Sequence, residues 1–85
     1  MIRHIVFWKF RPDADPEPFL QALSALPEQI DWIRGMHVAR SAAPNAAWDA
    51  ALEVDFDTLE DVARYRDDPR HKKVSALWKS KALSN

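Results

Sequence analysis

Apolar residues alternate along residues 2–10 in the way that is typical of a β-strand. One face of this segment carries Ile2, His4, Val6, Trp8 and Phe10. The opposite face also carries apolar residues, Ile5 and Phe7, between two basic ones. Because both faces are largely apolar, we expect a strand that is covered on both sides. A second copy of the chain is the simplest cover for the second face.

The segment after Asp15 has the spacing of an amphipathic helix. Asp15 followed by Pro16 is typical of an N-cap and the first helical position. Apolar residues then recur at helical spacing, and Pro27 predicts a break that divides the segment into two pieces. Gly35, the only glycine in the chain, marks the transition into a second strand over residues 36–42.

The second half of the chain repeats the order of strand and helix. Residues 48–56 alternate strictly between apolar and polar positions and form the clearest predicted strand. Thr58, three residues before Asp61, is typical of a helix start of the capping-box type. Pro69 ends this helix, and another helix begins near Arg70.

The order strand, helix, strand, strand, helix, with a short last strand, predicts an α+β fold. This order of elements is typical of the ferredoxin-like sandwich, an antiparallel sheet with helices on one face. The length suits one domain that spans residues 1–85. Two such sheets, packed through their uncovered faces, would form a dimeric α/β barrel.

Composition strengthens the expectation of a homodimer. The chain is 47% hydrophobic and contains four Trp, four Phe and one Tyr. A domain this small buries only about two-thirds of the surface that its unfolded chain exposes. It has no cysteine and therefore no disulfide, so self-association is the remaining common way to bury more apolar surface.

The same composition argues against several function classes. The net charge is −1 and the basic residues are dispersed, apart from the run 70–73, so nucleic acid is not an expected partner. No apolar run approaches the ~20 residues of a membrane span. The lack of cysteine, with a strand from the second residue that leaves no room for a signal peptide, predicts a cytoplasmic protein. No metal-ligand spacing or glycine-rich loop is present, and we expect no cofactor.

Three blocks of the sequence carry a resemblance to a known family. They are HIVFWKF at 4–10, WDAALEVDF at 48–56, and Tyr65-x-x-x-Pro69-x-His71. In this order and spacing they resemble the stress-responsive A/B-barrel domain family over nearly the whole chain. The resemblance implies a ferredoxin-like monomer that dimerises through its sheet and has a pocket between sheet and helices. Few residues follow the last helix, so the family's fourth strand would be very short or absent.

The resemblance also implies candidate site residues. Some resembling members are polyketide cyclases, and their catalytic roles would fall on His71, Tyr65 and His4. A histidine titrates near neutrality and can take a proton from an acidic carbon. A tyrosine hydroxyl can stabilise the resulting enolate. The expected substrate-binding walls of the cavity are Val6, Trp8 and Trp78.

Three hypotheses about function follow. The first is a dimer that binds a small apolar molecule, aromatic or polyketide-like. The second is a cofactor-independent cyclase (a lyase) or isomerase, with His71 as base and Tyr65 and His4 as helpers. The third is a non-catalytic structural or stress-associated dimer, in which both histidines are satisfied core residues. An enzyme requires the side chains of His71, Tyr65 and His4 to converge on an open cavity. A binding protein requires only the open cavity. In a structural dimer, side chains would fill that space.

The remaining polar residues have plainer explanations. Asp49, Glu53 and Asp55 share a face of the third strand and are expected at a wet or dimer-facing edge. The basic run 70–73 is expected to be a solvated helix start and not an anion site. His37 has no expected role.

Overall fold

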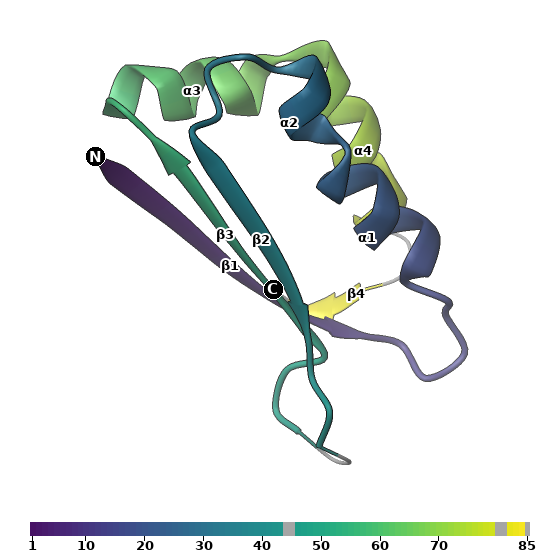
Figure 1. Cartoon of the computed structure of the whole chain (residues 1–85). Coiled ribbons are helices and arrows are strands. Elements are labelled where there is room, and N and C mark those ends of the chain that lie inside the picture. Colours follow the sequence, from purple (N-terminus) through teal and green to yellow (C-terminus); the bar gives the residue numbers. More distant parts are fainter. Residues whose placement is uncertain (44–45, 80–81, 85) are drawn as a thin grey trace.

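A computed structural model describes residues 1–43, 46–79 and 82–84 of the chain. In this part of the chain the strands form one antiparallel sheet, in the order β2-β3-β1-β4 (Figure 1). The strands are β1 (Ile2–Phe10), β2 (Gly35–Arg40), β3 (Ala50–Phe56) and β4 (Ala82–Ser84). The helices are α1 (Glu17–Ser24), α2 (Leu26–Gln29), α3 (Leu59–Asp67) and α4 (Pro69–Lys79).

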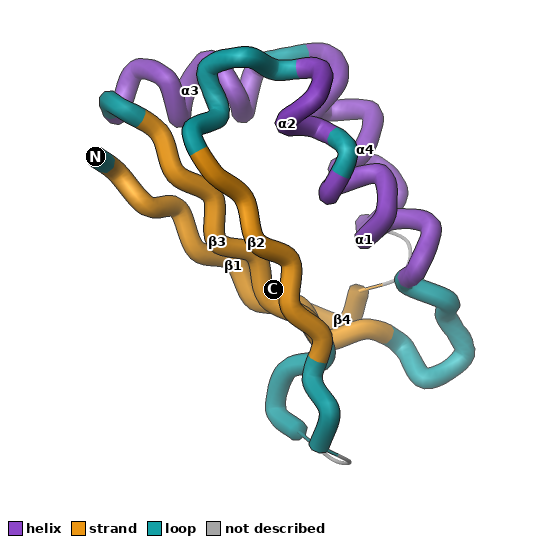
Figure 2. The backbone as a smooth tube through the Cα atoms, viewed as in Figure 1, coloured by secondary structure: helices purple, strands orange, loops and turns teal. Residues whose placement is uncertain are grey.

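The described helices cover one face of the sheet and leave the other face bare (Figure 2). This arrangement confirms the predicted α+β ferredoxin-like sandwich. The short β4 pairs with the end of β1, where Lys9 lies opposite Ser84 and Phe10 opposite Ala82. A fourth strand is therefore present, although it is only three residues long.

The alternation in β1 divides its side chains between the core and the bare face. Trp8, opposite Ala50 of β3, is 3% exposed and belongs to the core. Ile5 and Phe7 point the other way and are 49% and 45% exposed. The core lies between sheet and helices and consists of Trp8, Phe10, Phe19, Leu20, Leu23, Leu26, Ile30, Ile33, Ala50, Leu52, Val54, Phe56, Val62 and Tyr65.

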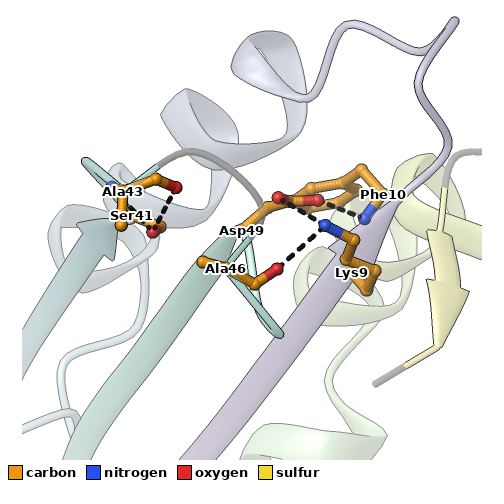
Figure 3. Close-up of polar contacts among 6 residues, drawn as sticks. All are labelled: Lys9, Phe10, Ser41, Ala43, Ala46 and Asp49. Carbon is orange, nitrogen blue, oxygen red and sulfur yellow. Dashed lines mark hydrogen bonds and ion pairs between the residues drawn. The ribbon is translucent and has the colours of Figure 1, made fainter.

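Asp49 has a structural role that differs from the one expected of it. It precedes β3, and its carboxylate accepts hydrogen bonds from the backbone N–H of Phe10 (2.8 Å) and from Lys9 Nζ (3.2 Å), as Figure 3 shows. Lys9 Nζ also donates to the carbonyl of Ala46 (3.1 Å). The Phe10 N–H and the Lys9 ammonium hold the pKa of Asp49 below its ordinary value. Asp49 thus links the segment before β3 to the end of β1 through these hydrogen bonds.

Two helical details also depart from the sequence pattern. The break expected at Pro27 lies slightly earlier, because α1 ends at Ser24 and Pro27 occupies the first turn of α2. Proline has no N–H to continue the α1 hydrogen-bond ladder, so the ladder stops before it. Leu77 has the helical spacing that would place it on the same face of α4 as His71 and Trp78, but it is 40% exposed. Among the described residues, no helix is long and apolar enough to cross a membrane.

Candidate functional site

A cavity of about 230 Å³ lies between β1 and the helices. It brings together all six residues singled out from the sequence: His4, Val6 and Trp8 from β1, Tyr65 from α3, and His71 and Trp78 from α4. The other lining residues are Phe19, Leu23, Leu52, Arg66 and Ser75. The cavity therefore has apolar walls with a small set of polar groups among them.

The junction between α3 and α4 places Tyr65 and His71 against each other. Asp68 precedes Pro69 and adopts an extended conformation (φ −65°, ψ 131°), which ends α3. Its carboxylate accepts a hydrogen bond from the Arg70 backbone N–H (2.8 Å), as the side chain of an N-cap residue does. The resulting turn brings the rings of Tyr65 and His71 to a centroid distance of 4.2 Å.

Arg70 strengthens this junction. Its guanidinium lies 2.8 Å from the Asp68 carboxylate and holds the pKa of that nearly buried group at about 2. The same guanidinium donates to the carbonyl of Gln29 at the end of α2. Arg70 therefore ties the start of α4 to α2, and its charge is already paired.

Two buried donors at the cavity have no hydrogen-bond partner in the described part of the chain. They are Trp8 Nε1 and the Tyr65 hydroxyl. Tyr65 is 1% exposed, and its burial raises the pKa of the phenol, so the hydroxyl keeps its proton. Buried polar groups are almost always hydrogen-bonded, because an unpaired one loses its interaction with water without compensation. Both donors belong to residues that line the cavity.

The two histidines at the cavity are half-buried and favour the neutral state. Desolvation lowers the pKa of His4 and of His71, and the charge of Arg66 adds to this effect on both. His71 Nδ1 lies 3.3 Å from the carbonyl of Arg66, which can only accept, so Nδ1 donates. In the neutral ring Nε2 then carries the free lone pair and can act as a base.

Sequence reasoning missed several lining residues. Ser75 lies one helical turn after His71, and its hydroxyl accepts from Trp78 Nε1 (2.9 Å). The i, i+4 spacing could have identified it. Arg66 gave no such signal, because its place at the cavity depends on the angle between α3 and α4. No group of three His, Asp or Glu side chains within residues 1–43 and 46–79 could hold a metal ion.

The model of one protein family matches almost the whole chain. It is the stress responsive A/B barrel domain, and the match spans residues 2–84. The chain belongs to this family. No curated protein sequence matches it.

Solved structures similar to this A/B barrel domain agree with its fold. A dimeric protein with a ferredoxin-like fold from Bacteroides fragilis is 32% identical; the alignment covers 96% of this chain and 86% of that one, with a TM-score of 0.85. A dimeric ferredoxin-like protein from Thermobifida fusca is 23% identical, with coverages of 96% and 81% and a TM-score of 0.83. Hydroxynitrile lyase from Passiflora edulis is 14% identical, with coverages of 96% and 83% and a TM-score of 0.84. At these identities the last two share the fold alone.

Proposed function

We propose that this protein is a homodimer that binds a small apolar molecule, aromatic or polyketide-like, in the cavity that is lined by His4, Tyr65 and His71. The observation that carries the proposal is the pair of buried, unpartnered donors, Trp8 Nε1 and the Tyr65 hydroxyl. A ligand that presents a carbonyl or hydroxyl oxygen to them would supply the missing acceptor. Val6, Trp8 and Trp78 would contact its apolar body.

The bare face of the sheet supports the dimer. Ile5 and Phe7 of β1 are half-exposed there, and Phe7 lies beside Trp48 at a ring-centroid distance of 5.8 Å. Contiguous apolar patches of this kind typically mark a protein interface. The similar proteins from Bacteroides fragilis and Thermobifida fusca are both dimeric. We also propose a cytoplasmic location, which fits the lack of cysteine.

A second candidate function is a cofactor-independent cyclase or isomerase. Neutral His71 could take a proton from a carbon between two carbonyl groups, and the Tyr65 hydroxyl could donate to the enolate oxygen. The carbanion would attack a second carbonyl of the same chain, forming a carbon–carbon bond, and His71 would return its proton to the new alkoxide. His4 would help to orient the substrate. The 4.2 Å contact between the rings of His71 and Tyr65 favours this candidate.

A purely structural dimer is the less favoured alternative. In that case side chains would fill the space between sheet and helices, and buried donors would find protein acceptors. The open volume of about 230 Å³ and the two unpartnered donors argue for a ligand instead.

Binding to a neutral aromatic ketone tests the proposal. We expect dihydroxyacetophenone to bind the wild-type protein in isothermal titration calorimetry. Tyr65→Phe, which removes one donor, should weaken binding about fivefold, the value of one neutral hydrogen bond. His71→Gln should also weaken it. His37→Gln is the matched control, because His37 is exposed on β2 and does not line the cavity. No binding, or equal binding by Tyr65→Phe, would contradict the proposal.

A further inference from the structure

The polar groups that line the cavity share one chemical character. Each carries at least one N–H or O–H group that can donate a hydrogen bond, and they belong to His4, Trp8, Tyr65, Arg66, His71 and Ser75. No Asp or Glu is among the described lining residues. A site of this composition attracts a ligand that is rich in acceptors and negatively charged.

Arg66 is the permanently charged side chain among the described residues that line the cavity. Within the described residues its guanidinium forms no ion pair. The other arginines each lie within 4.0 Å of a carboxylate: Arg3, Arg11, Arg34, Arg40, Arg64 and Arg70. Asp68, two residues along the chain from Arg66, is engaged by Arg70. An arginine that borders a cavity without a partner is available to a ligand.

The position of Arg66 relative to the buried donors sets the shape of the ligand. Arg66 is exposed and belongs to the rim of the cavity, whereas Tyr65 and Trp8 are almost fully buried. A guanidinium presents two parallel N–H groups that match the two oxygens of a carboxylate. The ligand would thus carry its acid group at the rim and a neutral acceptor at the buried end.

We infer that Arg66 determines specificity at this cavity, and that the ligand is an aromatic or similarly apolar carboxylic acid whose carboxylate pairs with the Arg66 guanidinium. This inference rests on the proposed function, since it names the chemical class that the same site takes. The apolar walls, which include Phe19, Leu23 and Leu52, hold the body of the acid. Its far end reaches the Tyr65 hydroxyl and Trp8 Nε1.

A matched pair of probes tests the inference: a hydroxynaphthoate and the corresponding neutral hydroxynaphthamide. We expect the wild-type protein to bind the acid about tenfold more tightly than the amide, as one charge-assisted bidentate contact would allow. Arg66→Gln should bind the two probes about equally, mainly because it binds the acid more weakly than the wild-type protein does. Arg66→Lys keeps the positive charge but loses the two parallel N–H groups of the guanidinium, so it should retain part of the preference for the acid.

Lys72→Gln is the matched control for net charge. Lys72 is exposed on α4, does not line the cavity, and loses the same unit of charge on substitution. It should keep the preference for the acid. Circular dichroism spectra that match the wild type would show that each variant is folded.

The outcomes separate this inference from the proposed function. If the wild-type protein binds acid and amide equally, the inference fails and the proposed function stands. A preference that survives Arg66→Gln, or that Lys72→Gln removes to the same extent, also overturns the role of Arg66. If neither probe binds, both the inference and the proposed function fail.

Discussion

The hydroxyl of Tyr65 lies inside the core, where the ring packs against Phe56 (centroid distance 5.1 Å) and against His71 (4.2 Å). The ring has the packing of a core residue, but the hydroxyl has no partner in the described part of the chain. Protein cores usually avoid this combination, because the unpaired hydroxyl destabilises the folded state. A residue kept at such a cost is a candidate for a role in binding.

Tyr65→Phe should therefore stabilise the free protein while it weakens ligand binding. Phenylalanine preserves the ring contacts and removes the unpaired hydroxyl, so we expect the free energy of unfolding to rise by about 1 kcal/mol. Urea denaturation with an unchanged m-value would measure this. A loss of stability of similar size would show that the hydroxyl already has a protein partner. The proposal that the Tyr65 hydroxyl is free to bind a ligand would then be wrong.

The residues that line the cavity differ in how well their position could be predicted from the sequence. His4 and Trp8 were predictable because the period of a strand puts alternate residues on one face. Tyr65 and His71 were singled out from the resemblance, and their ring contact depends on the turn at Asp68. Arg66 was not predictable, since a single exposed arginine in a helix is usually only a solvated charge.

At the scale of the elements, α3 carries Tyr65 to the cavity and is held at its start by a local cap. Thr58 Oγ1 accepts a hydrogen bond from the Asp61 backbone N–H (3.2 Å), as the capping pattern predicted. The end of α3 at Pro69 was also predictable, because the residue before proline avoids the helical conformation. Such signals are local, and the sequence contains them in full.

Thr58→Ala should lower the free energy of unfolding by about 1 kcal/mol, because one backbone N–H at the start of α3 loses its acceptor. Thr58→Ser keeps the hydroxyl and is the matched control, for which we expect a much smaller change. Thermal unfolding followed by circular dichroism would compare the variants. Equal stabilities of Thr58→Ala and the wild type would mean that the cap does not contribute.

Features that depend on packing between elements were harder to predict. Leu77 has the helical spacing of a core residue but is 40% exposed, because the angle at which α4 crosses the sheet decides which side faces inward. Asp49 looked like one of three surface carboxylates, yet it accepts bonds from Phe10 and Lys9 of a neighbouring strand. Sequence spacing does not contain these distances.

At the scale of the whole molecule, the order of elements was enough to predict the sandwich, since few topologies accommodate it. The cavity was not predictable from the residues alone. It is the volume that remains after the side chains of sheet and helices have packed, and small shifts of a helix would open or fill it. The bare sheet face follows from the apolar residues on both sides of β1.

Phe7→Asp should abolish the dimer that we propose. Phe7 is 45% exposed on the bare face, and a carboxylate there would be buried without a partner on association. Sedimentation velocity at fixed concentration should show a dimer for the wild type and monomer or aggregate for the variant. Leu59→Asp is the control, because Leu59 is 70% exposed on α3, a helix on the covered side of the sheet (Figure 2). A dimeric Phe7→Asp variant would contradict an interface on this face.

The central claim is that His4, Tyr65 and His71 border a cavity that takes a small molecule, and an NMR titration of the histidine rings tests it most directly. The ring signals of His4 and His71 would be followed from acid to neutral pH, without and with dihydroxyacetophenone. In the free protein we expect both to titrate below the ordinary histidine pKa, because burial disfavours the charged ring. The compound should shift both sets of signals and leave those of the exposed His37 in place. The account would be contradicted if the compound shifted the signals of neither His4 nor His71. It would also be contradicted if the compound shifted the signals of all three histidines equally.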